Sequence, residues 1–445
     1  MHITRLAAIL ATALTLSAAR AQHTIPADPE PRWFKGNLHT HTFWSDGNDF
    51  PEMVVEWYRD NGYNFLALSD HNTLSQGQRW MPITTINQRS RESAFPKYLE
   101  RFGHSWVETR GEGDALEVRL KPFDEYRALV EQRNQFIMIQ GEEITGSFDR
   151  RPIHINATNL AERIDPQPAD SVEEAIRKVM LEVNAQAEAH GREILPHLNH
   201  PNFGYGVTAE DIAPVLEEHF FEVFNGHTGV HNDGDDHHAP TEQIWDIVNT
   251  IRIAELNAPP ILGIATDDGH SYHGHSPVSV PGRGWVMVRT THLTPESLIR
   301  AMKAGDFYAS TGITLDAINF DPTTQTLTLT IHPVEGETYT TRFVGTLRNT
   351  TLDSDPVLDA DGNELVATRR YSPDIGRTLA TVRGTTATYQ LTGDELYVRA
   401  IVESDAPPER PTRESLLKRA WTQPVTPTNP TPADHESASQ QIPPP

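Results

Sequence analysis

The sequence of 445 residues contains no cysteine, which removes several kinds of chemistry at once. Disulfides, thiolate zinc sites, iron–sulfur clusters and cysteine nucleophiles all need a thiol and are excluded. Positive charge is also scarce: 37 Lys and Arg face 61 Asp and Glu, which gives a net charge of −24. This balance argues against a protein that coats nucleic acid or an anionic membrane, since both need a positive field. A small anionic substrate stays possible where metal ions supply local charge.

Long apolar runs are nearly absent, and a mean hydropathy of −0.50 excludes a protein with many membrane spans. The exception is LAAILATALTLSAA near the N-terminus, which is too short to span a bilayer comfortably. It precedes Ala19-Arg20-Ala21, an A-x-A cleavage pattern. We therefore predict a signal peptide over residues 1–21, a mature protein that begins at Gln22, and a periplasmic or secreted location. No membrane anchor is expected, because a lipoprotein signal needs a cysteine. A buried first helix is the alternative.

Residues 32–312 alternate between strand-like and helix-like segments. Such repeated βα units favour a parallel sheet that is either closed into a barrel or doubly wound. Residues 74–134 break this rhythm and are predicted to be a surface insertion that covers part of the site. Strands are predicted at 33–41, 64–70, 135–143, 152–157, 193–198, 220–224, 260–266 and 285–289, and helices at 50–61, 171–189, 241–256 and 295–304.

The composition of the sequence changes after residue 312. Short segments rich in Thr, Val, Tyr and Leu, separated by turn residues, predict a small all-β, β-sandwich-like domain over 313–422. From residue 423 to 445 the chain is rich in Pro, Thr, Ser and Gln. A segment of this composition cannot bury enough apolar surface to order itself, so we predict a disordered tail.

Side chains that bind metals stand at the ends of several apolar segments. A single histidine at a strand end is more often structural, but here the pattern recurs along the chain. On a parallel barrel such ends converge on the face where active sites are built. Nitrogen and oxygen ligands without thiolate suit two to three zinc, manganese or iron ions in a hydrolytic site. The segments are NLHTHTFWSDG (His39, His41, Asp46), NFLALSDHN (Asp70, His71), FIMIQGEEIT (Glu142, Glu143), LPHLNHPN (His197, His200) and ILGIATDDGH (Asp268, His270), with His154 at the end of its own short segment.

The motifs HTHTFWSDG, SDHN, GEEIT, NHPN and DDGH resemble, in this order, those of the polymerase and histidinol phosphatase (PHP) domain family. The resemblance covers about residues 32–312. It implies a distorted (β/α)7 TIM-like barrel that holds up to three metals and hydrolyses phosphate esters. The implied ligand sets are His39, His41, Glu143 and Asp268 for one metal, Glu143, His154 and His200 for a second, and Asp46, His71 and His270 for the third.

Glu143 is preferred over Glu142 because it fits the G-x-E pattern of the family. In addition, only one of two neighbouring side chains can point inward from a regular strand. The C-terminal β-domain also resembles domains attached to exported members of the family.

Further residues are predicted to act around the metals. Phosphate usually needs a cation besides the metals, and Arg283 and Arg151 are candidates for this role. His227 is a candidate for contact with the substrate. Asp267, Asn225 and Asp70 are expected to orient metal ligands.

The sequence therefore predicts an exported metal-dependent phosphoesterase that acts on a small phosphorylated substrate, a monoester or a diester. The metals would lower the pKa of a bridging water toward neutrality. Two alternatives stay open: a metal-dependent amidohydrolase, and a secreted protein that binds glycans or surfaces through its β-domain. The substrate, the metal and the oligomeric state are not predicted.

Overall fold

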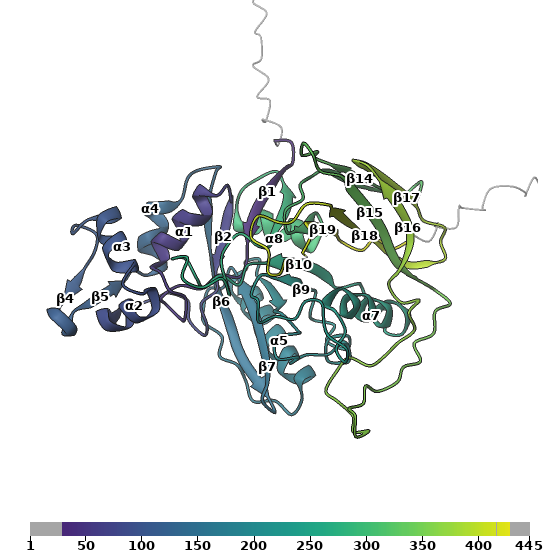
Figure 1. Ribbon diagram of the computed structural model, residues 1–445, viewed down its shortest axis with the longest axis horizontal. Helices are drawn as coiled ribbons and strands as arrows, with labels where there is room; N and C mark the ends of the chain where they lie inside the picture. Colours follow the sequence, from purple (N-terminus) through teal and green to yellow (C-terminus); the bar gives the residue numbers. More distant parts are fainter. Residues whose placement is uncertain (1–28, 415, 428–445) are drawn as a thin grey trace, which may run out of the picture.

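The computed structural model describes residues 29–414 and 416–427 (Figure 1). The predicted signal peptide lies outside the described residues, as does the predicted tail from residue 428 onward. Within the described residues, no helix combines the length and the apolar character needed to cross a bilayer.

One large sheet of thirteen strands organises the molecule. Its first part has the order β10-β9-β8-β7-β6-β2-β1, and neighbouring strands are parallel except for β7, which is antiparallel to β6 and to β8. A single parallel bridge from Thr40 to Gly269 links the segments that follow β1 and β10, the two ends of this run. The strands are β1 (Arg32–Asn37), β2 (Phe65–Leu68), β6 (Ile137–Phe148), β7 (Arg151–Thr158), β8 (Leu195–Leu198), β9 (Phe220–Asn225) and β10 (Leu262–Thr266).

The antiparallel β7 departs from the expected run of parallel strands. Strands β6 and β7 form a long hairpin whose turn residues, Asp149 and Arg150, have φ values of 45° and 64°. Two successive residues with positive φ produce the tight turn whose twist matches a hairpin. As a consequence, Glu143 and His154 lie within the hairpin rather than at strand ends.

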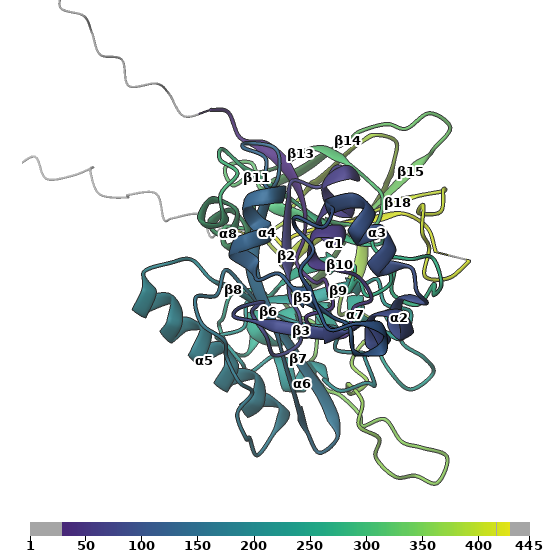
Figure 2. The same cartoon turned by 90° about the vertical axis from the view of Figure 1, so that its left-hand side faces the viewer.

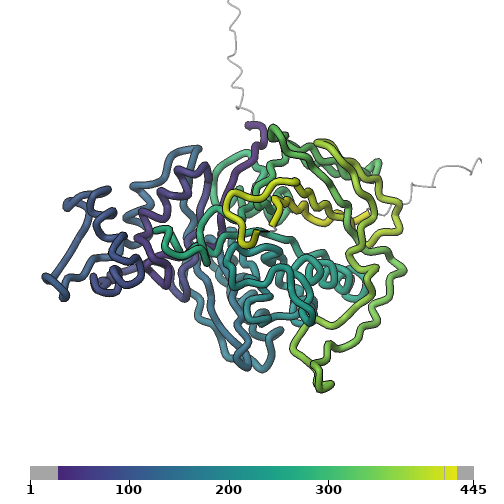
Figure 3. The backbone as a smooth tube through the Cα atoms, in the orientation of Figure 1, coloured from purple at the N-terminus to yellow at the C-terminus, as the bar shows by residue number. Residues whose placement is uncertain are grey.

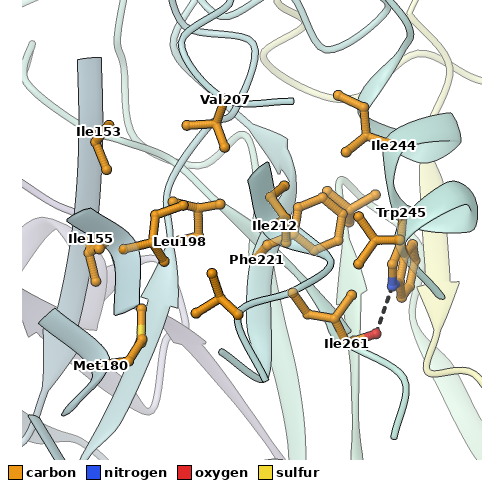
Figure 4. Packing of buried hydrophobic residues seen from close by; sticks show 14 of the residues in the cluster. Ile153, Ile155, Met180, Leu198, Val207, Ile212, Phe221, Ile244, Trp245 and Ile261 are labelled. Atoms are coloured by element: carbon orange, nitrogen blue, oxygen red, sulfur yellow. Dashed lines mark hydrogen bonds between the residues drawn. The ribbon is translucent and has the colours of Figure 1, made fainter. Parts of the chain in front are cut away.

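Helices α1 (Pro51–Asp60), α5 (Val172–His190), α7 (Thr241–Ala254) and α8 (Pro295–Lys303) correspond to the four predicted helices. Helix α5 starts where the Ser171 hydroxyl accepts a hydrogen bond from the Glu174 N–H, and it ends at Gly191, whose φ is 59°. Apolar faces of α5 and α7 pack on β7, β8 and β9, as Met180, Leu198 and Trp245 show in Figure 4.

The predicted insertion forms a lobe at one side of the molecule (Figures 1 and 2). It holds a small sheet of order β3-β5-β4 and has its own core. Arg89 of this lobe donates a hydrogen bond to the Ser45 carbonyl, and Lys97 lies beside His273, so the lobe contacts two loops near the predicted site. Its elements are β3 (Arg79–Pro82), α2 (Ile83–Ser90), α3 (Ala94–Phe102), β4 (Thr109–Arg110), η1 (Gly113–Ala115), β5 (Glu117–Leu120) and α4 (Phe123–Val130).

The C-terminal strands continue the large sheet in the order β11-β12-β19-β18-β15-β16, and all these neighbours are antiparallel. A separate three-stranded sheet, β13-β14-β17, shares a core with them. The strands are β11 (Trp285–Thr290), β12 (Phe307–Ser310), β13 (Leu315–Asp321), β14 (Thr326–Ile331), β15 (Tyr339–Leu347), β16 (Arg377–Arg383), β17 (Thr386–Gln390), β18 (Glu395–Ser404) and β19 (Arg419–Thr422).

The fold extends past residue 423, where the tail was predicted to begin. The Gln423 side chain accepts a hydrogen bond from the Gly263 N–H and donates one to the Gly263 carbonyl, both at 2.9 Å. Its amide thereby satisfies the free edge of β10 as a neighbouring strand would. Figure 3 shows this C-terminal segment, in yellow, running back across the middle of the molecule.

Candidate metal centre

The nine predicted metal ligands meet in one cluster, although they come from segments as distant as residues 39 and 270. Each belongs to a group of three or four side chains whose ligand atoms lie within 4.8 Å of one another. The groups are His39, His41 and Asp268; His39, Glu143 and His200; His71, Glu143 and His154; His41, Asp46, His71 and His270; and a further one of His39, His197 and Glu222.

The most buried part of the cluster holds His39, His41, Glu143 and Asp268. Nε2 of His39 is 3.4 Å from Glu143 Oε1 and 3.3 Å from Asp268 Oδ1. Nε2 of His41 is 3.3 Å from Glu143 Oε2 and 3.2 Å from the same Asp268 oxygen. A tetrahedral ion with bonds of about 2.0–2.1 Å separates its ligand atoms by about 3.3–3.4 Å. His39, His41 and Asp268 therefore offer three ligand atoms near such an ion, and Glu143 approaches the two histidines through different oxygens.

Two nitrogens of this group are also left without hydrogen bonds. Nε2 of His39 and Nε2 of His41 are both buried. Buried polar atoms without partners carry a free-energy cost and are rare in native proteins. Here both nitrogens lie within 3.4 Å of carboxylate oxygens, which is the arrangement that a cation between them would satisfy.

The charges of this group suit a cation. Burial opposes ionisation of Glu143 and Asp268, but the surrounding histidines hold both carboxyl pKa values well below their usual range. Burial and the nearby His270 lower the pKa of His41 to about 3, so its ring is neutral and keeps a lone pair. For His39, burial acts in the same direction, yet the carboxylates of Asp268, Glu222 and Glu143 raise its pKa overall.

Glu143 lies at the centre of the cluster, and the neighbouring Glu142 does not. Oε1 of Glu143 is 2.9 Å from His154 Nδ1 and 3.6 Å from His200 Nε2, while Oε2 is 2.8 Å from His71 Nδ1. Glu142 points to the opposite side of β6, where it accepts a hydrogen bond from the Ile164 N–H at 3.0 Å. Burial there raises the pKa of Glu142 to about 7. Alternation along the strand thus gives the two carboxylates different environments.

The outer part of the cluster, Asp46, His71 and His270, opens to solvent. The Asp46 side chain is 53% exposed, and its oxygens lie 3.3 Å from His270 Nε2 and 3.6 Å from His71 Nε2. Nδ1 of His41 also approaches Asp46, at 3.6 Å. A neutral imidazole has a single lone pair, so His41 can ligate either the inner or the outer position, not both.

The residues predicted to orient ligands lie around the cluster. Asp70 accepts hydrogen bonds from the Thr42 N–H and the Ser45 hydroxyl, at 2.8 and 2.6 Å, and so fixes the loop that carries Asp46. Asp267 accepts three backbone N–H groups of residues 282–284. Asn225 donates to Asp268 Oδ2 at 3.3 Å.

Sequence reasoning assigned no role to Glu222 and Asn199. Glu222 Oε1 is 2.7 Å from His39 Nδ1 and accepts the Thr266 hydroxyl at 2.6 Å. The Asn199 amide donates to Glu143 Oε1 at 2.8 Å. The available signal for Glu222 was a charged residue in the otherwise apolar strand FFEVFN, because a buried carboxylate needs partners.

Two predicted phosphate-binding residues are engaged elsewhere. The buried Arg283 donates to the carbonyls of residues 226, 277, 278 and 410. Arg151 bonds the Gly206 carbonyl and pairs with Asp211. Their guanidinium groups are used in holding loops together, so the structure does not support either as a substrate-binding residue. His227 does lie beside the cluster, with its ring 6.0 Å from that of His270.

The fold and the cluster define an α/β protein with a large, partly parallel sheet and a set of His and carboxylate side chains able to bind metal. No family model matches the sequence, and no curated protein matches it.

Some solved structures are similar in part. A two-domain protein from Bacteroides vulgatus, which contains a predicted PHP-like metal-dependent phosphoesterase, is 13% identical with a TM-score of 0.37, over 85% of this chain and 92% of that chain. A putative metal-dependent phosphoesterase from Bifidobacterium adolescentis is 14% identical with a TM-score of 0.30, over 56% and 94%. PsfC from Pseudomonas syringae is 9% identical with a TM-score of 0.30, over 61% and 88%.

Proposed function

We propose that this protein is a metal-dependent phosphoesterase of the PHP family that hydrolyses small phosphate mono- or diesters. One observation carries the proposal: the buried Nε2 atoms of His39 and His41 lie 3.2–3.4 Å from carboxylate oxygens of Glu143 and Asp268, and neither nitrogen makes a hydrogen bond. The seven strands from β10 to β1 would form the distorted barrel of this family, a reading supported by the Thr40–Gly269 bridge.

Two to three divalent ions, zinc, manganese or iron, would be held by the cluster. The inner ion would take His39, His41, Glu143 and Asp268; the second would share Glu143 and add His154 and His200; the outer ion would take Asp46, His71 and His270. Such ions supply Lewis-acid charge for phosphoryl oxygens and make water a better nucleophile near neutral pH.

Three further side chains hold the proposed metal ligands in position. Glu222 and Asn199 hold His39 and Glu143 in orientation through hydrogen bonds of 2.7 and 2.8 Å. Asp70 fixes the loop of Asp46, the most exposed of the proposed ligands. The substrate would therefore approach at the outer part of the cluster, while the inner part stays closed to water.

The amidohydrolase alternative is less well supported. Many sites of that kind use a carbamylated lysine where two metals meet, and Glu143 occupies that position here. Lys121 is the only buried lysine among residues 29–414 and 416–427, and it pairs with Glu108 in the insertion.

Export is part of the proposal and rests on the N-terminal sequence. We expect protein recovered from the periplasm or the medium to begin at Gln22 or at pyroglutamate derived from it. N-terminal sequencing checks this, and exported protein that still begins at Met1 would contradict it.

The catalytic proposal is tested by metal analysis together with hydrolysis assays. The panel contains p-nitrophenyl phosphate, bis(p-nitrophenyl) phosphate and, for the alternative, p-nitroanilide substrates. We expect two to three metals per chain, release from a phosphate ester, and loss of both after chelation. Asp268→Asn should lose metal and activity, whereas His237→Ala, an exposed loop variant, should keep both. Full activity without metal, or hydrolysis of anilides alone, would refute the proposal.

A further inference from the structure

Two hydrogen bonds donated by backbone N–H groups hold His227 in place in the loop after β9. Its own N–H donates to Asn225 Oδ1 at 2.8 Å. Its ring atom Nδ1 accepts a hydrogen bond from the Gly229 N–H at 2.9 Å. Because the same Asn225 side chain donates to Asp268, the position of His227 is tied to a proposed metal ligand.

The contact with Gly229 fixes which nitrogen carries the proton. A backbone N–H can only donate, so Nδ1 of His227 must offer its lone pair, and in a neutral ring the proton then sits on Nε2. Burial lowers the pKa of His227, which favours the neutral ring. Nε2–H is left as a donor, and none of the described residues accepts a hydrogen bond from it.

The loop is built for this close approach. A Cβ atom on Gly229 would lie 2.8 Å from Cε1 and 2.9 Å from Nδ1 of His227, closer than real Cβ contacts. Any other residue at 229 would push the imidazole away. Since φ at Gly229 is not in the left-handed region, contact with the ring is the constraint that an alanine would violate.

The ring stands at the edge of the metal centre. Its centroid is 6.0 Å from that of His270 and 6.3 Å from that of Phe203, whose ring in turn lies 5.2 Å from that of His200. His227 is only half-buried, so a molecule bound at the cluster can reach it. The two arginines predicted to bind phosphate are engaged elsewhere, Arg283 by backbone carbonyls and Arg151 by Asp211. Neither is therefore free to bind the phosphate.

We infer that His227 is a substrate-binding residue whose Nε2–H donates a hydrogen bond to a phosphoryl oxygen of the ester. This inference rests on the proposed phosphoesterase function and deepens it. A neutral N–H donor fixed in one direction orients the phosphoryl group without adding a charge that would repel the metals. Gly229 acts as a positioning residue, because its N–H and its lack of a Cβ keep the imidazole ring in this orientation.

The test is a double-mutant cycle on the metal-loaded protein. His227→Ala should lower kcat/KM about 10- to 100-fold, the range for a hydrogen bond to a charged group, and should weaken binding of inorganic phosphate similarly. Gly229→Ala should produce a comparable loss. In the His227→Ala background, however, Gly229→Ala should change little, because the ring that it displaces is already absent.

Metal content and a control variant complete the design. Metal per chain and melting temperature should match the wild type in all three variants, and His227→Gln, which keeps an N–H donor, should recover part of the loss. His237→Ala should be unaffected. Unchanged phosphate binding and kcat/KM in His227→Ala, or additive effects of the two alanine substitutions, would overturn the inference while the phosphoesterase stays active. A wild-type protein that hydrolyses no phosphate ester would instead refute the proposed function.

Discussion

The guanidinium of Arg399 on β18 forms a buried two-point ion pair with the carboxylate of Asp246 on α7. Nε and Nη2 of Arg399 lie 2.9 and 2.7 Å from the two Asp246 oxygens, and the Tyr397 hydroxyl donates to the same carboxylate at 2.7 Å. The pair joins a helix of the half that carries the candidate metal centre to a strand of the C-terminal half. The same interface buries Trp245 of α7 together with Trp421 of β19.

Breaking this pair should destabilise the whole protein. Arg399→Leu leaves Asp246 buried and charged, so we expect the free energy of unfolding to fall by about 3–5 kcal/mol. Arg377→Leu, which removes an exposed partner of Asp374, should cost less than about 1 kcal/mol. Urea unfolding of both variants checks the contrast. Equal effects would mean that the Asp246 ion pair does not join the two halves energetically.

The neighbouring carboxylates of β6 should respond differently to the same change. Glu143→Gln removes the negative charge at the centre of the cluster. Metal affinity should therefore fall by more than the 10- to 100-fold loss that is typical when a residue hydrogen-bonded to a metal ligand is changed. Glu142→Gln keeps an acceptor for the Ile164 N–H and should retain its metals and most of its rate. Metal content and turnover are measured for both in one buffer. A silent Glu143→Gln would show that another residue bridges the metals.

Glu222 should tune metal binding without contacting substrate. Its carboxylate accepts a hydrogen bond from the His39 ring and holds the Nε2 lone pair toward the inner position. Glu222→Gln should weaken metal affinity about 10- to 100-fold, since the amide is a poorer acceptor. Competition with a chelator reports the affinity directly. At saturating metal the variant should approach wild-type turnover, and a loss that excess metal cannot restore would contradict this role.

Stability should depend on pH through Glu218, which lies outside the proposed ligand set. Burial raises the pKa of its carboxyl from 4.5 to about 8. The folded protein therefore keeps this proton while the unfolded chain releases it, so the stabilisation is complete below pH 4.5 and is lost as the pH rises to about 8. In that window the free energy of unfolding should fall by up to about 1.4 kcal/mol per pH unit.

Glu218→Gln cannot ionise but can still accept the Phe220 N–H. The variant should show a shallower decline than the wild type when unfolding is measured from pH 5 to pH 8. The difference between the two proteins isolates Glu218 from the other titrating groups. Parallel curves would mean that this carboxyl is ionised in the folded state.

Local patterns in the sequence predicted the elements well. The apolar strand before Asp70 and the Ser171 start of α5 appear where the sequence indicated them, because both depend on nearby residues. The nine ligand candidates were selected by the resemblance to the PHP family, and the cost of burying His and carboxylate side chains without partners supported them.

Long-range pairing could not be predicted in the same way. Asp149-Arg150 is not a common hairpin turn sequence, so the antiparallel β7 was missed. The sequence predicts that Arg283 is free to bind phosphate, because the carbonyls that it actually binds come from loops distant along the chain. The part played by Glu222 depends on His39, which is 183 residues away. Such contacts are set by the assembled fold rather than by any local segment.

The bond between Gln423 and Gly263 has a consequence for how the chain reaches its native state. The edge of β10 is completed by a residue 160 positions later, and β1 pairs with β11, which starts at residue 285. During synthesis, the contacts of Gln423 with β10 can form only after the strands from β1 to β18 have been made. Folding dominated by such distant contacts is slow. A chain that ended before Gln423 would leave the Gly263 N–H and carbonyl at the edge of β10 without these partners.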